Sequence, residues 1–181
     1  MLNAGDRAPN FALESDLGRP LGPRDYPGKV LVVYFYPKDH TSGCTREAQA
    51  FAAASKAIAA EGAQVLGISK DTVKTHCSFR DKFHLTFPLL SDPDLSVHKA
   101  FGAYGEKTSY GRLVLGTIRS TFIVDSKGKI VRVFPRVNVE GHADQVLAAL
   151  RDLGANDKTA RPAKAPTRPA KRSARRKTKG T

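Results

Sequence analysis

Tryptophan is absent from this 181-residue sequence, methionine occurs once and cysteine only twice. Two cysteines 33 positions apart fit neither a disulfide-stapled scaffold nor a zinc site, which needs about four suitably spaced ligands. No uninterrupted apolar run approaches the ~20 residues of a membrane-spanning helix, and the first ten residues lack the basic and apolar regions of a secretory signal. These absences favour a cytoplasmic location. In that reducing compartment a pair of thiols is redox-active or inert rather than structural.

Positive charge is concentrated near the C-terminal end of the chain. The formal net charge is +13, and residues 155–181 contribute ten basic residues against one acidic residue. This segment contains no leucine, isoleucine, valine or aromatic residue, so it cannot bury enough apolar surface to fold. We therefore expect a folded domain over residues 1–154 and a disordered tail, rich in Lys, Arg, Ala and Pro, over 155–181.

Hydrophobic patterning predicts alternating strands and helices in the folded domain. After a short hairpin and loop over residues 1–29, apolar runs typical of buried strands alternate with segments of helical spacing. The expected strands are 30–36, 65–69, 87–90, 120–125 and 130–135, and the expected helices begin near residues 45, 72, 95 and 142, with a loop over 102–118. The β–α–β units imply parallel strands, and the final hairpin adds an antiparallel edge. The pattern predicts a three-layer α/β/α domain with a central mixed sheet.

Cys44 lies where the first strand gives way to a long alanine-rich helix. A cysteine at the start of a helix is well placed to be a thiolate, because the free backbone N–H groups and the helix dipole favour the anion. A lone cysteine is nevertheless more often a small buried side chain. Position alone therefore leaves both interpretations open.

The residues around Cys44 resemble the peroxidatic motif of the peroxiredoxins. Pro37, Thr41 and Cys44 stand in the pattern Pro-x-x-x-Thr-x-x-Cys after an apolar strand. The longer string YFYPKDHTSGCTREA is similar to the bacterioferritin comigratory protein, or peroxiredoxin Q, branch of that family. Further similar strings are GISKDTVKTH, FPLLSDPD, AYGEK and IRSTFIVDSKGKI. The resemblance covers roughly residues 3–153 and implies a thioredoxin-like fold.

The resemblance implies an antioxidant peroxidase that reduces hydrogen peroxide and organic hydroperoxides through Cys44, without metal, flavin or haem. It assigns Arg119 as the cation that stabilises the thiolate and hydrogen-bonds the peroxide. Thr41 is expected to exchange hydrogen bonds with the peroxide, and Pro37 to shape the loop and shield the sulfur from water. Glu47 is interpreted first as an acidic residue that complements the helix dipole. A second hypothesis is that Glu47 holds Arg119 or the loop in place.

Attack on peroxide leaves Cys44 as a sulfenic acid, which must meet a thiol or risk over-oxidation. In the commonest arrangement of this branch the second cysteine stands five residues further on, where this chain has Gln49. The other thiol is Cys77, which helical spacing places on the flank of the helix predicted from Thr72. Some members carry a resolving cysteine on this helix, about one turn later, at the position of Arg80. Cys77 is therefore the predicted resolving residue, and an external thiol acting on a one-cysteine enzyme is the alternative.

Two other functions and the partners also remain open. A thioredoxin-like disulfide reductase normally needs Cys-x-x-Cys, of which this chain has only Cys44. A nucleic-acid-associated protein would use the ten cations of 155–181 to hold DNA or RNA phosphates without sequence preference. A solubilising extension is an equally good interpretation of that tail. The resemblance implies a thioredoxin-type reductant, and we expect a monomer or weak dimer.

Overall fold

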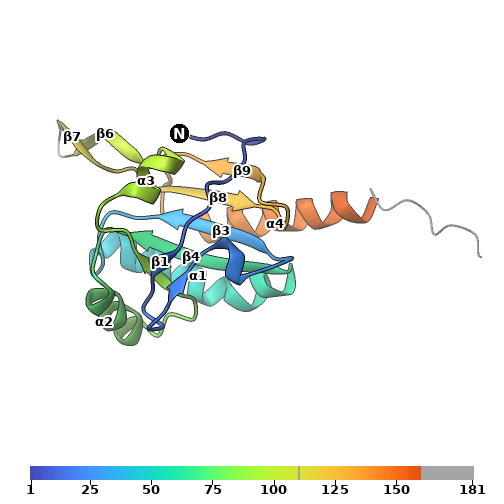
Figure 1. Cartoon of the computed structure of the whole chain (residues 1–181), viewed down its shortest axis with the longest axis horizontal. Helices are drawn as coiled ribbons and strands as arrows, with labels where there is room; N and C mark the ends of the chain where they lie inside the picture. The colour runs from blue at the N-terminus through green and yellow to red at the C-terminus, as the bar shows by residue number, and fades with distance from the viewer. Residues whose placement is uncertain (110, 160–181) are drawn as a thin grey trace, which may run out of the picture.

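The computed structural model describes residues 1–109 and 111–159, and within them a central sheet has five strands in the order β5–β4–β3–β8–β9 (Figure 1). These strands are β3 Val30–Phe35, β4 Ala63–Ser69, β5 Leu89–Ser91, β8 Ser120–Val124 and β9 Ile130–Phe134. β3, β4 and β5 run parallel, whereas β8 and β9 pair antiparallel to their neighbours. The predicted mixed sheet is confirmed, with the first apolar run as its middle strand.

Helices cover both faces of this sheet (Figure 1). The helices α1 Ser42–Ala60 and α4 His142–Thr159 pack together on one face, where Val32 and Tyr34 of β3 point. The short helix α3 Ser96–Phe101 covers the other face, where Leu31, Val33 and Phe35 point. Alternate residues of β3 thus enter two separate cores. This explains why the whole run is apolar.

The N-terminal segment begins with the predicted hairpin, made of β1 Leu13–Glu14 and β2 Pro20–Leu21, followed by a 3-10 turn over Pro23–Asp25. The helix α2 Val73–Phe83 connects β4 to β5, and Thr72 caps its start by accepting a hydrogen bond from the Thr75 N–H. The helix α1 begins at Ser42, three residues before its predicted start, so that Cys44 is its third residue.

The segment 102–118, predicted to be a loop, contains a second hairpin. Its strands are β6 Tyr104–Ser109 and β7 Arg112–Thr117, and they form a separate two-stranded sheet. Leu113 and Leu115 are each 68% exposed, so this ribbon buries little of its apolar surface. Figure 1 shows it extending away from the central sheet beside α3. Its mixed polar composition lacks the continuous apolar run of a core strand, which is why the loop prediction was wrong.

The helix α4 continues to Thr159, past residue 154, where the folded domain was expected to end. Gly154 disfavours a helix interior by only ~1 kcal/mol relative to alanine, so it is a weak stop signal. The predicted disordered tail otherwise concerns residues 160–181, which lie outside the described residues. Across residues 1–109 and 111–159, no helix combines the length and apolar character needed to cross a membrane.

Gly67 of β4 provides a test of the close packing on the α1 side of the sheet. A Cβ atom there would stand 2.8 Å from Leu89 Cδ2 and 2.9 Å from the Tyr34 ring, and both neighbours are buried. We expect Gly67→Ala to lower the free energy of unfolding by about 1–3 kcal/mol in urea denaturation.

Gly105→Ala is the matched control, because a Cβ at Gly105 meets only Ile118 Cδ1 at 3.5 Å. That variant should stay within about 0.5 kcal/mol of the parent protein. Equal losses in both variants would show that the packing around Gly67 is not the cause.

Candidate active site

Cys44 lies in the first turn of α1, directly behind the carboxyl end of β3. Thr41 is the N-cap, with extended backbone, and the Thr45 N–H donates to its carbonyl at 2.9 Å. The N–H groups of Ser42, Gly43 and Cys44 come before this first intrahelical hydrogen bond, so helix geometry gives them no partner within the helix. Cys44 is only 2% exposed, and it is a free thiol. The sulfur thus combines shelter from water with the positive end of a helix, which favours a thiolate.

Arg119 reaches Cys44 from a position 75 residues away in the chain. The antiparallel pairing of β3 with β8 sets Ser120 opposite Phe35, so Arg119 sits where the loop before α1 begins. Its Nη2 donates a hydrogen bond to Cys44 Sγ at 3.2 Å. Burial lowers the pKa of Arg119, but the neighbouring Glu47 and Cys44 raise it more, so its pKa lies above the usual value. The sulfur therefore faces a permanent positive charge.

Glu47 holds the other branch of the same guanidinium. Its carboxylate forms an ion pair with Arg119 Nη1 and lies on α1 one turn after Cys44. Glu47 is 1% exposed, and burial raises the pKa of its carboxyl to about 7, although Arg119 acts in the opposite direction. This ion pair is the contact that the second predicted role of Glu47 requires, and the role itself stays a prediction.

Thr41 and Pro37 border the site without contacting the sulfur through a hydrogen bond. The Thr41 hydroxyl is exposed and donates to the Lys38 carbonyl at 3.1 Å. Because a hydroxyl carries one hydrogen, Thr41 is left with lone pairs that can only accept from a substrate. Pro37 lines a groove of about 250 Å³ together with Arg119. A molecule entering that groove meets the guanidinium that contacts Cys44.

Two further features of the site were not foreseen from the sequence. Lys107 of β6 and Arg136 also line the groove, and burial together with Arg119 lowers the pKa of Lys107. On the core side, the buried Tyr34 hydroxyl and Glu47 Oε1 have no hydrogen-bond partner among the described residues. Burial, with Glu47 and Cys44 nearby, raises the pKa of Tyr34 well above its usual value. Lys107 lies in the string AYGEK, which was singled out without a role for the lysine.

Cys77 lies on α2 and is half-buried, as its predicted place on the helix flank requires. Its thiol contacts the backbone carbonyl of Asp16 at 3.6 Å. Neither cysteine is in a disulfide. The two thiols lie in separate environments, Cys44 beside Arg119 and Cys77 beside Asp16.

Within residues 1–109 and 111–159 no group of three His, Cys, Asp or Glu side chains is arranged to hold a metal ion. His98 and His142 are buried, whereas His40 is exposed. His98 pairs with Asp92 at 2.6 Å. His142 contacts the Thr121 hydroxyl at 2.8 Å, and burial lowers its pKa to about 4.

Comparisons with known proteins agree with this geometry. The model of the AhpC/TSA family matches residues 4–133. A putative peroxiredoxin of Mycobacterium tuberculosis is 48% identical over 152 residues, covering 84% of this chain and 95% of that protein. A putative peroxiredoxin of Coxiella burnetii is 43% identical over 149 residues, covering 82% of this chain and 99% of the relative.

Solved structures are similar as well. Peroxiredoxin Q of Xanthomonas campestris superposes with a TM-score of 0.75 at 43% identity, over 80% of this chain and 91% of that one. A peroxiredoxin Q variant of Xylella fastidiosa gives a TM-score of 0.79 at 39% identity, over 84% and 98% of the two chains. Another structure from Xanthomonas campestris, of the bacterioferritin comigratory protein, concerns its alkyl peroxide reduction activity.

The raised pKa of Glu47 predicts a pH dependence of the site. Below about pH 7 the carboxyl is protonated, so it no longer attracts Arg119 as an anion. We expect the rate constant for reaction of Cys44 with peroxide to fall as the pH drops through about 7. In Glu47→Gln this inflection should be absent, because glutamine does not titrate. Rate measurements between pH 5 and 9 would check this, and an inflection kept in Glu47→Gln would contradict it.

The Glu47 carboxyl also predicts how the free energy of unfolding depends on pH. A carboxyl with a raised pKa favours folding most when it is protonated, and this contribution is lost as the pH rises from 4.5 to about 7. The difference in unfolding free energy between the parent protein and Glu47→Gln should therefore shift in favour of the variant across that range.

Proposed function

Because this chain belongs to the AhpC/TSA family of peroxiredoxins and is a thiol-dependent peroxidase, we propose that Cys44 is the thiol that attacks peroxide. The observation that carries this assignment is the 3.2 Å hydrogen bond from Arg119 Nη2 to Cys44 Sγ at the start of α1. A guanidinium and a helix N-terminus both stabilise the thiolate, which is the nucleophilic form.

The reaction follows from these contacts. The Cys44 thiolate attacks one oxygen of a hydroperoxide, the O–O bond breaks, and the other oxygen leaves with the electron pair and takes up a proton. Cys44 becomes a sulfenic acid, and the products are water from hydrogen peroxide or an alcohol from an organic hydroperoxide. Arg119 and the free N–H groups of the first α1 turn stabilise the charge that develops on oxygen. Thr41 accepts a hydrogen bond from the peroxide hydroxyl and so orients it.

We infer that hydroperoxides of more than one size are substrates. The groove beside Arg119 also has apolar walls, from Pro37, Ile118 and Val137, next to its cations. A hydrogen peroxide molecule occupies a small part of its volume of about 250 Å³, and an organic group can follow the apolar wall. The alkyl peroxide activity described for the Xanthomonas relative supports organic hydroperoxides as substrates here too.

Cys77 resolves the sulfenic acid in our proposal. Its thiol and the Cys44 sulfenic acid condense to a disulfide with loss of one water, so no further oxidant is needed. A disulfide requires Cα atoms within about 7 Å. Cys44 is buried in the first turn of α1, and the Cys77 thiol contacts the Asp16 carbonyl. We therefore propose that the first turn of α1 unwinds locally to bring the two sulfurs together.

In one relative the spacing of two cysteines differs from that in this chain. Two Xanthomonas structures carry single cysteine substitutions at positions 36 residues apart in that protein, against 33 between Cys44 and Cys77. Counted without gaps, the second position falls at Arg80, one turn further along α2. The alternative is a one-cysteine cycle in which an external thiol reduces Cys44. In either case we propose a thioredoxin-type protein as the electron donor. The expected cytoplasmic location and monomer or weak dimer stay predictions.

Replacing Cys77 separates the two cycles. We expect Cys77→Ser to reduce one equivalent of peroxide per chain at the parent rate and then to stop, with thioredoxin and its reductase as electron source. The parent protein should turn over and yield a Cys44–Cys77 crosslinked peptide in mass spectrometry. Cys44→Ser should consume no peroxide. Sustained turnover by Cys77→Ser would rule out the resolving role and leave the one-cysteine cycle.

The basic tail supports a second proposed activity, non-specific DNA or RNA binding, because 155–181 carries ten cations and one anion. Since α4 runs to Thr159, a chain ending there keeps the helix whole. We expect a gel shift with duplex DNA for the full-length chain that weakens steeply between 50 and 200 mM salt. The shortened chain should lose this shift and keep its peroxidase rate. Equal DNA affinity of both chains would disprove the proposal.

A further inference from the structure

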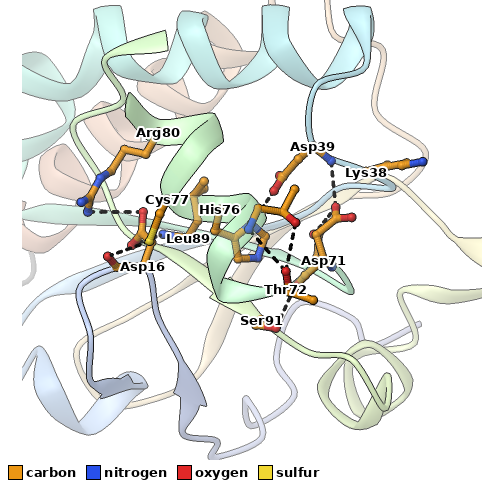
Figure 2. A network of polar contacts seen from close by, with 12 residues as sticks. Asp16, Lys38, Asp39, Asp71, Thr72, His76, Cys77, Arg80, Leu89 and Ser91 are labelled. Atoms are coloured by element: carbon orange, nitrogen blue, oxygen red, sulfur yellow. Dashed lines mark hydrogen bonds and ion pairs between the residues drawn. The ribbon is translucent and has the colours of Figure 1, made fainter. Parts of the chain in front are cut away.

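A buried polar pair links the active-site loop to the helix that carries Cys77. Asp39 lies in the loop between β3 and α1, and His76 directly precedes Cys77 on α2. His76 Nδ1 lies 2.7 Å from Asp39 Oδ2, and both side chains are fully buried. Figure 2 shows the two residues facing each other, with the Cys77 sulfur on the adjoining part of α2. The pair therefore joins the loop before α1 to α2, and the proposed peroxidase cycle requires these two elements to change their relative position.

The hydrogen bonds of the pair are complete. His76 Nε2 lies 3.2 Å from the Leu90 carbonyl, so both ring nitrogens lie within hydrogen-bonding distance of an oxygen atom. The Tyr36 hydroxyl donates to the second oxygen of Asp39 at 2.7 Å. Because an unpaired polar group in such a buried place is costly, removing one member leaves the others unsatisfied. The pair is therefore a strong and specific restraint.

The restraint acts on a loop that is anchored and strained. The Asp39 N–H donates to Asp71 Oδ2 at 2.8 Å (Figure 2). Asp71 Oδ2 also accepts from the Ser69 hydroxyl at 2.9 Å. The next residue, His40, has a φ of 61°, a left-handed conformation that a side chain disfavours. The His40 ring packs on Phe79 of α2, with ring centroids 5.1 Å apart. Contacts to α2 and to the end of β4 thus hold a backbone that would otherwise relax.

We propose that the Asp39–His76 pair positions the loop between β3 and α1 for peroxide reduction, and that breaking this pair releases Cys44 toward α2. The loop carries Pro37 and Thr41 and leads into the first turn of α1, so its position sets the peroxide against the sulfur and Arg119. A misplacement of about 1 Å is enough to slow a reaction ~100-fold. His76 and Asp39 act through this loop and are positioning residues.

The two halves of the proposal predict opposite effects on two steps. A broken pair leaves the loop less well placed, so attack on peroxide slows. The same change frees the loop, so Cys44 leaves its pocket more often and the condensation with Cys77 speeds up. The second half rests on the proposed resolving role of Cys77, whereas the first half needs only Cys44.

The same helix offers a matched control. Arg80 of α2 forms an ion pair with Asp16 at 3.3 Å, and the Asp16 carboxylate also accepts from the Leu89 N–H at 3.1 Å (Figure 2). This pair ties α2 to the N-terminal hairpin and not to the active-site loop. Arg80→Gln therefore weakens the attachment of α2 without touching the restraint on Asp39.

The first experiment uses the Cys77→Ser chain as background. Since the protein has no tryptophan, the rate constant of Cys44 with hydrogen peroxide is measured by competition with a haem peroxidase. Hydrogen exchange of the backbone amides of residues 39–46 is followed in the reduced protein. We expect His76→Asn to lower the rate constant at least about tenfold and to speed this exchange. Arg80→Gln should change neither, although it lowers the melting temperature.

Tyr36→Phe is the second variant, because it removes only one hydroxyl from the pair and keeps the ring. It should move both measurements in the same direction as His76→Asn by about threefold, corresponding to the loss of one hydrogen bond. It keeps the proposal testable if His76→Asn does not fold. Unchanged rate and exchange in Tyr36→Phe and in any folded His76→Asn would overturn the proposal. Equal slowing by Arg80→Gln would overturn it as well, since general loosening of α2 would then suffice.

The second experiment restores Cys77 and follows disulfide formation after one equivalent of peroxide. His76→Asn, or Tyr36→Phe in its place, should form the Cys44–Cys77 disulfide several-fold faster than the parent chain and accumulate less Cys44 sulfinate. Slower disulfide formation would refute the release half. If the parent chain forms no such disulfide, the resolving role of Cys77 fails by itself. The measurements in Cys77→Ser then still decide whether the pair positions the loop.

Discussion

The arrangement of the site depends on one guanidinium held between two buried groups. Arg119 donates to Cys44 Sγ through Nη2 and pairs with Glu47 through Nη1. Phe35 of β3 pairs with Ser120 of β8, and this register brings Arg119 to the end of β3. The helix α1 carries Cys44 and Glu47 one turn apart. Burial makes each contact stronger than it would be in water, and the same burial raises the pKa of Glu47 to about 7. The predicted pH dependence of the Cys44 reaction follows from this one buried carboxyl.

The loop between β3 and α1 faces two opposing demands. In the proposed cycle, peroxide reduction needs Cys44 enclosed and Thr41 in place, whereas the proposed Cys44–Cys77 disulfide needs the same turn to open. The contacts of Asp39 with His76 and Asp71 favour the enclosed state, and the left-handed backbone at His40 stores strain against it. A loop held by a few buried contacts, rather than by a large apolar area, is suited to switch between two states.

Sequence patterning predicted the elements that bury apolar surface and missed those that do not. The run Val30–Phe35 was recognised as a central strand because both of its faces are covered. The ribbon of β6 and β7 escaped detection because its leucines remain exposed, which removes the alternation that marks a half-buried strand. His76 is fully buried on α2. Its polar partner was invisible, since Asp39 lies 37 positions away in a loop.

By itself, the sequence determined that this chain is an α/β peroxiredoxin with Cys44 at a helix start, because hydrophobic period and a dense local motif are properties of neighbouring residues. Spacing along the chain also excluded a second cysteine at Gln49. Only the tertiary structure decided that Arg119 reaches the sulfur and that Glu47 holds it, because strand register joins residues 75 positions apart. It likewise decided that His76 is bound to Asp39. Such pairings depend on where elements pack, and no local pattern encodes them.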